Sequence, residues 1–167
     1  MARKKALITG VSGQDGAYLA KFLLEKNYQV FGGERQNANR DFWRLKKLQL
    51  TNEIKIIPFE MLEENNINKV IREEKFFEIY NLAAQSFVDK SFTSPVYTSN
   101  VNSLGVIRLL EAIRYFSKKT KLYQASSSEM FGTTKLKLQD EKTYFQPVSP
   151  YAISKLHSHW MINLYRE

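Results

Sequence analysis

The chain opens on an apolar run that stops at a glycine-rich turn. Residues 6–9 have strand character, Gly10, Gly13 and Gly16 follow at intervals of three, and apolar residues then recur at helical spacing over 17–25. The first glycine permits a tight turn, the second lets backbone N–H groups approach a pyrophosphate, and the third lets the helix pack closely on the strand. The helix N-terminus adds unpaired N–H donors. This order of strand, turn and helix favours dinucleotide binding over a glycine turn without a ligand.

Apolar runs and helical stretches alternate along the rest of the chain. Further strands are expected at 29–32, 54–58, 77–84 and 121–126, and helices at 63–74, from Pro95 onward and at 150–166. The helix after Pro95 is expected to turn its apolar residues towards the core: Val101, Leu104, Ile107, Leu109, Leu110 and Ile113. The alternation predicts an α/β fold, a doubly wound parallel sheet of the NAD(P)-binding Rossmann type. Because ligands bind beyond the carboxyl ends of such strands, the glycine turn and the loops after the fourth and fifth strands are expected to meet there.

Tyr151 and Lys155 stand four residues apart near the start of the last helical stretch. On a helix both side chains project from one face. A lysine ammonium in that position favours a phenolate over a phenol. Such a tyrosine can take the proton of a sugar hydroxyl while a hydride leaves the same carbon. A surface helix also produces this pair by chance, so its weight comes from the dinucleotide turn at the start of the chain.

Composition excludes several classes of function. At 167 residues, with 43% hydrophobic and 13% aromatic residues and no cysteine, the chain suits one globular domain without disulfides or thiolate metal sites. The net charge of +8 includes short basic clusters near expected helix ends, where lysines complement the helix dipole. No nucleic-acid-binding motif accompanies these clusters, so no nucleic-acid partner is expected. The apolar run before Gly10 is too short for a signal peptide or a membrane span, which indicates a cytoplasmic protein without membrane contact. His157 and His159 do not share a helix face, and no metal site is expected.

Five longer motifs support a more specific comparison. They are Thr9-Gly-Val-Ser-Gly-Gln-Asp-Gly-Ala-Tyr-Leu19, Tyr80-Asn-Leu-Ala-Ala-Gln-Ser86, Tyr123-Gln-Ala-Ser-Ser-Ser-Glu-Met-Phe-Gly132, Ser149-Pro-Tyr-Ala-Ile-Ser-Lys-Leu156 and Asn163-Leu-Tyr-Arg-Glu167. With them the chain resembles the GDP-mannose 4,6-dehydratase family of the extended short-chain dehydrogenase/reductases. The resemblance spans nearly the whole chain and is weakest between residues 34 and 62. The Gly-Gln-Asp-Gly form of the turn separates that family from related epimerases and reductases.

The resemblance implies a nucleotide-sugar dehydratase that converts GDP-mannose to GDP-4-keto-6-deoxymannose. Tyr151, helped by Lys155, would deprotonate the C4 hydroxyl, and Glu129 would remove the C5 proton before water is lost from C6. Ser127 takes the family's threonine position, which hydrogen-bonds the sugar. From the residues alone, a serine and a carboxylate after a strand also fit a helix or turn cap. The resemblance assigns substrate contacts to Ser86, Ser127, Ser128 and Glu129.

The expected cofactor is NADP. Arg35 follows the second strand, where arginine suits a 2′-phosphate and an acidic residue suits a ribose 2′-hydroxyl. Glu34 precedes it and weakens the distinction. The family commonly has two arginines here, where this chain has Arg35-Gln36, and the family's Gly-Asp-Leu after the third strand appears as Phe59-Glu-Met61. The resemblance assigns cofactor contacts to Gly10, Gly13, Gln14, Asp15, Gly16, Arg35, Glu60, Leu82, Ala83, Ala84, Tyr151 and Lys155.

The family's chains continue well beyond residue 167. Residues 1–167 are therefore expected to form the N-terminal part of an NADP-binding Rossmann domain, truncated before the last strands and the C-terminal substrate domain. Two alternatives remain open: an NAD(P)-dependent nucleotide-sugar epimerase or reductase, and a dinucleotide-binding fragment without catalysis. By resemblance, GDP-mannose is the expected small-molecule partner and a homodimer or homotetramer the expected assembly.

Overall fold

A computed structural model describes residues 3–35 and 41–167. The chain divides into two compact units. The sheet unit comprises Met1–Ala83 and Arg108–Ala125, and the helical unit comprises Ala84–Ile107 and Ser126–Glu167.

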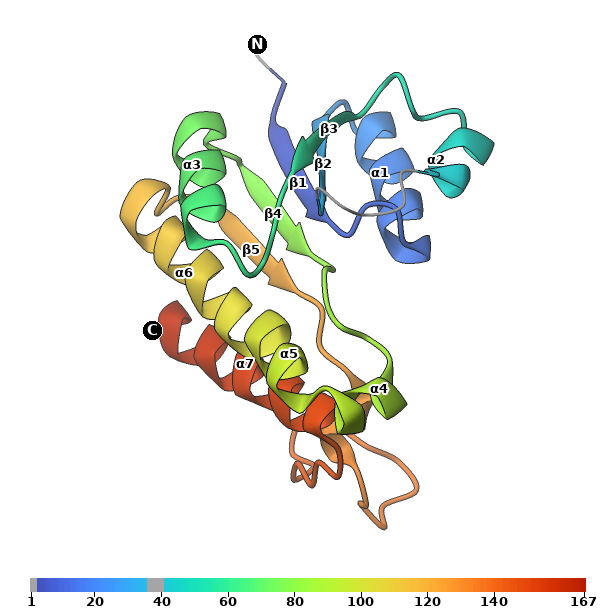
Figure 1. The fold of residues 1–167 in the computed structure, drawn as a ribbon, viewed down its shortest axis with the longest axis vertical. Coiled ribbons are helices and arrows are strands. Elements are labelled where there is room, and N and C mark those ends of the chain that lie inside the picture. Colours follow the sequence, from blue (N-terminus) through green and yellow to red (C-terminus); the bar gives the residue numbers. More distant parts are fainter. Residues whose placement is uncertain (1–2, 36–40) are drawn as a thin grey trace. The chain divides into compact units, whose positions relative to one another are not determined.

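The sheet unit is built on five parallel strands, which confirms the predicted α/β class (Figure 1). The strands are β1 (Lys5–Thr9), β2 (Gln29–Glu34), β3 (Lys55–Pro58), β4 (Glu78–Asn81) and β5 (Lys121–Gln124). Their order in the sheet is β3-β2-β1-β4-β5. Because β1 lies in the centre and the chain adds strands first to one side and then to the other, loops after strands on both sides come together beside β1.

Strand register brings the carboxyl ends of four strands level with one another. Thr9 at the end of β1 pairs with Gly33 of β2 and with Asn81 of β4. At the far side, Asn81 pairs with Gln124 of β5. The residues that follow these strands therefore start from one edge of the sheet, as the sequence predicts for a ligand-binding edge.

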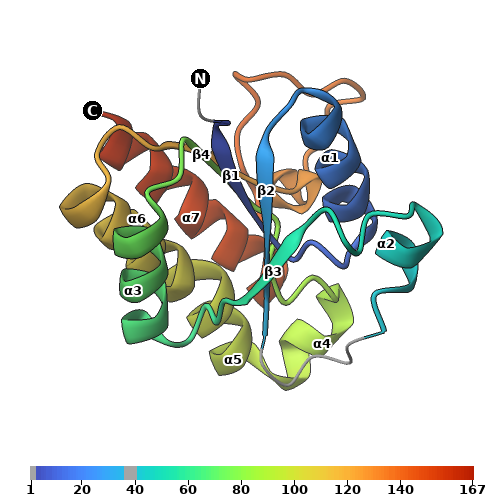
Figure 2. The same ribbon diagram turned by 90° about the horizontal axis from the view of Figure 1, so that it is seen from above.

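Helices cover both faces of this sheet (Figure 2). Helices α1 (Gln14–Glu25) and α2 (Trp43–Lys47) lie on one face, and α3 (Glu64–Glu74) and the end of α6 (Gly105–Phe116) lie on the other. On the α1 side, alternate strand residues and the inner face of α1 and α2 form one buried apolar cluster: Ala6, Ile8, Val11, Ala17, Ala20, Leu23, Val30, Leu45, Leu50 and Ile54. Burial on both faces is what a parallel sheet requires.

The intervening strand residues face the other way. Leu7, Phe31 and Ile79 are fully buried there, and the ring of Phe31 meets that of Phe76 edge-on at 5.2 Å between centroids. On α3, Ile67 and Ile71 are fully buried and lie four residues apart. Their spacing places both on one face of the helix, which is the face that covers the sheet.

The helical unit contains α4 (Val88–Thr93), α5 (Pro95–Ser99), a π-helical turn (Asn100–Leu104), a 3₁₀ turn (Ser128–Phe131) and α7 (Pro150–Arg166). Helix α7 begins with Pro150 at its first turn, and the Ser149 hydroxyl accepts the Ala152 amide at 3.0 Å. A serine N-cap followed by proline is a strong helix-start signal, which explains why the sequence predicts the start of α7 correctly.

The helix that the sequence predicts after Pro95 differs from a continuous α-helix. Its middle turn is a π-helix, so α5 and α6 are separate segments joined by Asn100–Leu104. Within that turn Val101, Asn102 and Ser103 are buried, whereas Leu104 is 48% exposed and does not reach the core. The prediction for Leu104 is wrong because a π turn carries more residues than an α turn and so changes the direction in which the next side chain points.

Two short helices are absent from the sequence prediction. Helix α2 has five residues and α4 has six. Neither is long enough for a 3.6-residue apolar period to repeat, so hydrophobic spacing carries no signal for them.

Candidate functional site

The glycine turn has the backbone that the sequence predicts. Gly10 has φ of +70°, a conformation that a side chain would strain, and its amide bonds the carbonyl of Gly33 at 3.0 Å. The Gly13 amide bonds the Gly10 carbonyl at 3.0 Å and closes the turn, and α1 begins at Gln14. Within the described chain, no side chain caps the N-terminus of α1. Its first amides are thus oriented outward, which suits an anionic group such as a pyrophosphate.

Gly16 serves packing. A Cβ at this position would lie 2.6 Å from the Gly10 carbonyl oxygen and 2.7 Å from Cα of Val11, so the turn could not close against α1. At Gly13, a Cβ would meet only the Gly10 carbonyl oxygen, at 3.2 Å. The two glycines therefore have different roles. Gly16 lets the turn pack against α1, and Gly13 leaves the outer surface of the turn free of a side chain.

A hydroxyl at the end of β1 fixes the loop after β4. The Thr9 hydroxyl donates to Oδ1 of Asn81 at 2.5 Å and accepts the amides of Leu82 and Ala83 at 3.1 and 3.0 Å. Asn81 in turn donates to Oε1 of Gln124 at 2.7 Å. This chain of hydrogen bonds ties the ends of β1, β4 and β5 to one another, and because Thr9 and Asn81 are almost completely buried, the bond between them is shielded from water.

The loop that Thr9 holds lies directly against the glycine turn. A Cβ on Gly10 would be 3.2 Å from the Ala83 amide nitrogen and 3.3 Å from its Cα. The structure thus brings Leu82 and Ala83, both predicted cofactor contacts, next to Gly10. The sequence prediction contains neither Thr9 nor Asn81 as a site residue. A signal existed, since both are polar residues at the carboxyl ends of apolar strands.

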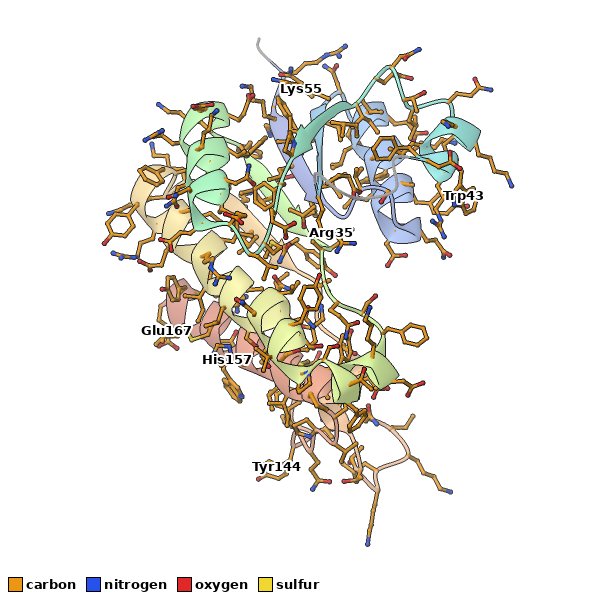
Figure 3. The ribbon with its side chains drawn as sticks, in the orientation of Figure 1. Arg35, Trp43, Lys55, Tyr144, His157 and Glu167 are labelled. Atoms are coloured by element: carbon orange, nitrogen blue, oxygen red, sulfur yellow. The ribbon has the colours of Figure 1, made fainter. Side chains whose placement is uncertain are left out.

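The end of β2 also returns to the glycine turn. The Glu34 carboxylate accepts the Ser12 amide through Oε1 at 2.7 Å. From α2, Arg44 donates to the carbonyl of Ser12 at 3.3 Å, and its guanidinium lies 4.3 Å from the Trp43 ring centroid. Arg35 is exposed just past the carboxyl end of β2, whereas Lys55 lies at the opposite, amino end of β3 (Figure 3). Gln36 lies outside the described residues.

Glu60 is half-buried in the turn after β3. Its amide is bonded to the side chain of Asn66 at 2.9 Å, and its carboxylate accepts the Leu62 amide at 3.4 Å. In this structure the Glu60 carboxylate supports its own turn. The contact between Glu60 and the cofactor remains a prediction.

In the helical unit, Tyr151 and Lys155 lie one turn apart on α7. Both are buried, with exposed fractions of 8% and 4%, and Nζ of Lys155 lies 5.9 Å from the Tyr151 ring centroid. Burial lowers the pKa of the Lys155 ammonium to about 8. A buried amine close to a phenol, with a pKa near the physiological range, is uncommon for a structural helix and typical of a site that handles protons.

The 3₁₀ turn of residues 128–131 packs against α7 in the same unit. Its N-cap is Ser127, whose hydroxyl accepts the Glu129 amide at 3.2 Å. The capping role that the residues alone allow for Ser127 is therefore present. Ser128 and Glu129 are exposed, and the side chain of Ser86, before α4, is exposed as well. For Ser127 a cap and a contact with substrate are compatible, because a hydroxyl can accept one bond and donate another.

A buried polar network that sequence reasoning missed supports the start of α7. Asn102 in the π turn accepts the Gln85 amide at 2.8 Å and donates to the Gln85 carbonyl and the Ser154 hydroxyl at 3.0 and 3.1 Å. The Ser154 hydroxyl donates to the Tyr151 carbonyl at 2.7 Å, and Ser158 donates to the Asn102 carbonyl. These bonds fix the turn of α7 that carries Tyr151 and Lys155. No local pattern reveals the bonds of Asn102, since they join residues that are 17 to 56 positions apart.

The predicted residues thus fall into two groups. Within the sheet unit, the glycine turn, Leu82 and Ala83 adjoin one another, while Arg35 follows β2 and Glu60 follows β3. The helical unit holds the remaining predicted residues: Ala84, Ser86, Ser127, Ser128, Glu129, Tyr151 and Lys155.

Other features of the described chain do not extend the site. Among these residues, no three histidine, aspartate or glutamate side chains gather as they would around a metal ion. None of the helices in the described ranges combines the length and hydropathy needed to cross a bilayer. A hollow of about 480 Å³ lies at the amino ends of β1, β4 and β5, where Lys4, Lys5 and Lys119 contribute to its walls. That edge is opposite the glycine turn, and its lysines are surface residues.

Comparison with known proteins identifies the family that the chain matches. The family model described as GDP-mannose 4,6 dehydratase matches residues 7–167. A GDP-mannose 4,6-dehydratase of Vibrio cholerae is 44% identical over 172 residues, covering 99% of this chain and 46% of the relative. The chain therefore spans about half the length of the curated relatives that it matches.

Solved structures show the same fold at lower identity. The UDP-Glc/GlcNAc 4-epimerase of Campylobacter jejuni superposes with a TM-score of 0.88 at 20% identity, over 97% of this chain and 49% of that one. The dTDP-glucose 4,6-dehydratase of Bacillus anthracis, solved in complex with NAD, gives a TM-score of 0.80 at 24% identity, over 97% and 50%. Both likenesses concern the architecture. Together with the Gly-Gln-Asp-Gly turn and the Tyr151–Lys155 pair, the family match shows that the chain belongs to the GDP-mannose 4,6-dehydratase family.

Proposed function

We propose that the protein containing this chain is an NADP-dependent GDP-mannose 4,6-dehydratase, converting GDP-mannose to GDP-4-keto-6-deoxymannose and water. The observation that carries the proposal is the buried Tyr151–Lys155 pair on α7, in one unit with the exposed carboxylate of Glu129. The reaction needs a base at a sugar hydroxyl and a second base at a neighbouring carbon. The helical unit offers one group of each kind.

The residues of the sheet unit fit a dinucleotide. Gly10 has a positive φ, Gly13 carries no side chain, and within the described residues no side chain caps the start of α1. These features leave a backbone surface whose N–H donors are accessible to a ligand. Such a surface suits a pyrophosphate. The B. anthracis neighbour was solved in complex with NAD. When bound, a nicotinamide would accept a hydride from C4 of the sugar and return it to C6.

The chain's own groups would move the protons. Tyr151 would accept the C4 hydroxyl proton, and the Lys155 ammonium would stabilise the phenolate that precedes this transfer. Glu129 would then take the C5 proton, which the C4 ketone makes acidic, and pass it to the departing C6 hydroxyl, which leaves as water. C5 would regain a proton, originally that of the C4 hydroxyl, when the hydride returns to C6. Ser127 would hold the sugar by a hydrogen bond. No net oxidant is consumed, because the hydride taken from C4 returns to the same sugar.

Incubation with GDP-mannose and NADP tests the proposal. We expect a product one water lighter than the substrate, identified by mass spectrometry and NMR as the 4-keto-6-deoxy sugar, with no accumulation of NADPH. The full protein containing this chain and the 167-residue chain itself should be assayed in parallel. Glu129→Gln should abolish product while cofactor binding persists, and Glu141→Gln, an exposed carboxylate in the following loop, should leave turnover unchanged.

Three other results would redirect the proposal. A C4-epimerised or C4-reduced sugar in place of the 4-keto-6-deoxy product would assign an epimerase or reductase. Product undiminished in Glu129→Gln would remove Glu129 from the reaction. Cofactor binding without turnover in the full protein would leave a dinucleotide-binding module.

A further inference from the structure

One buried side chain in the helical unit links the loop after β4 to the helix that carries Tyr151 and Lys155. Asn102, in the π turn, is 2% exposed. Its side-chain oxygen accepts the Gln85 amide at 2.8 Å, and its side-chain nitrogen donates to the Gln85 carbonyl at 3.0 Å and to the Ser154 hydroxyl at 3.1 Å. An asparagine side chain has two N–H donors and one oxygen acceptor, so all of these groups are engaged. An aspartate would offer no donor to the Gln85 carbonyl, and a leucine would offer neither donor nor acceptor.

On one side of the link, Asn102 holds the backbone of Gln85. Both the N–H and the C=O of Gln85 are bonded to this one side chain. Gln85 stands between Ala84 and Ser86, which are a predicted cofactor contact and a predicted substrate contact. Gln85 is buried and Ser86 is exposed. The loop therefore presents the Ser86 side chain from a backbone that Asn102 fixes.

On the other side, Asn102 holds the first turns of α7. The Ser154 hydroxyl that it bonds donates onward to the Tyr151 carbonyl at 2.7 Å, and Ser154 immediately precedes Lys155. The π turn bonds the same residue of α7 a second time, because the Ser103 hydroxyl donates to the Ser154 carbonyl at 3.2 Å. Ser154 is 2% exposed, and hydrogen bonds buried in this way are electrostatically stronger than bonds in water. The part of α7 that carries Tyr151 and Lys155 is thus fixed against the π turn.

The turn that carries Asn102 points to the same role independently. π-helical turns are rare and occur frequently at functional sites. This one lies between α5 and α6, packs against α7, and buries the polar side chains of Asn102 and Ser103. Burial of a polar side chain costs free energy unless the group is hydrogen-bonded, and both of these side chains bond Ser154. The π turn therefore places two buried polar groups opposite one residue of α7.

From these contacts we infer that Asn102 is a positioning residue for the proposed reaction, because it holds the Ser86 loop and the Tyr151–Lys155 turn at a fixed separation. The inference rests on the proposed function and deepens it. Asn102 is buried, so it acts through these two segments and not by contact with the sugar. The sugar must meet Ser86 and Tyr151 at the same time, and a displacement of about 1 Å of one against the other can cost about a hundredfold in rate.

Steady-state kinetics on the full protein containing this chain, with GDP-mannose and NADP, test the two sides of the link separately. Ser154→Ala breaks only the bond to α7, so kcat should fall by about three- to tenfold while KM for GDP-mannose stays within about twofold of the wild-type value. Asn102→Leu breaks both sides, so kcat should fall by about tenfold or more and KM should rise as well. In the double variant, kcat should be no lower than in Asn102→Leu alone, because the bond between the two residues is already lost.

Asn163→Leu provides the matched control. Asn163 is a half-buried asparagine farther along α7, and its side-chain nitrogen lies 3.2 Å from Nε2 of His159. Its replacement should leave kcat and KM unchanged. Each kcat is referred to the folded fraction of the variant, measured by circular dichroism, so that lost stability is not counted as lost turnover. If Asn102→Leu does not fold, the kcat of Ser154→Ala alone decides whether the link matters.

The outcomes separate the inference from the proposed function. Wild-type turnover with both single variants within about twofold of its kcat, or losses in the two variants that multiply in the double variant, would overturn the inference and leave the dehydratase standing. A wild-type full protein that makes no 4-keto-6-deoxy product would overturn the proposed function, and the positioning role with it.

Discussion

Replacement of Lys155 by methionine should stabilise the chain at neutral pH. The ammonium is only 4% exposed, and burial lowers its pKa from 10.5 to about 8. One pKa unit corresponds to about 1.4 kcal/mol, so keeping this lysine charged in the folded state costs about 3 kcal/mol as an upper bound. Methionine has a similar length and carries no charge, so Lys155→Met should recover much of that free energy at pH 7.

The sign of the pH dependence follows from the lowered pKa. Between pH 8 and 10.5 the unfolded lysine keeps its proton while the folded one has lost it. The unfolded state then binds more protons, so the wild type gains stability as the pH rises through this window. The advantage of Lys155→Met over the wild type should therefore be full below pH 8 and vanish near pH 10.5.

Urea unfolding at pH 7 and pH 10, followed by circular dichroism, measures both effects. The exposed Lys21 on α1 provides the matched control, and Lys21→Met should change stability by less than about 0.5 kcal/mol at either pH. A Lys155→Met chain less stable than the wild type at pH 7, or an advantage equal at both pH values, would refute the burial argument.

Four further substitutions, at Thr9 and at two glycines of the turn, test the cofactor edge. Thr9→Val removes the hydroxyl that accepts the amides of Leu82 and Ala83, so it should lower the free energy of unfolding by about 1–3 kcal/mol. Thr9→Ser keeps the hydroxyl and should retain the stability of the wild type. A loss of the same size in Thr9→Ser would show that the methyl group of Thr9 matters instead. Gly16→Ala should cost about 1–3 kcal/mol because its Cβ would lie 2.6 Å from the Gly10 carbonyl oxygen, whereas Gly13→Ala should leave the urea midpoint nearly unchanged and weaken dinucleotide binding in a titration. Equal unfolding midpoints for Gly16→Ala and Gly13→Ala would contradict the claim that only Gly16 is required for packing of the turn on α1.

The parts of the molecule that the sequence predicts are those whose signal is local. Gly10 needs a positive φ whatever surrounds it, and Ser149-Pro150 starts a helix through its own hydroxyl and ring. The alternation of strands and helices then fixes a parallel sheet, because few other arrangements bury both faces of such strands.

The parts that the sequence misses depend on contacts between distant segments. Nothing near Glu34 shows that its carboxylate bonds Ser12 of the glycine turn, and nothing near Asn102 shows that it bonds Gln85 and Ser154. The polar ends of β1, β4 and β5 are an intermediate case. Thr9 stands where the first strand was expected to end, but Asn81 and Gln124 lie before the expected ends of the fourth and fifth strands, at residues 84 and 126. The network could therefore be anticipated only once the strand order and the true strand ends were known.

The π turn at Asn100–Leu104 sets the rotational position of the side chains on the helices that flank it. Each residue advances an α-helix by about 100°, so a turn with an additional residue shifts every side chain that follows it relative to every one before it. The side chain of Asn102 bonds Gln85 and Ser154 from this shifted position on the helix. A point substitution along α5 or α6 changes one side chain. An insertion or deletion of a single residue would instead change the direction of every side chain that follows it in the segment. The geometry of this turn therefore constrains the length of the segment more strictly than the identity of its individual residues.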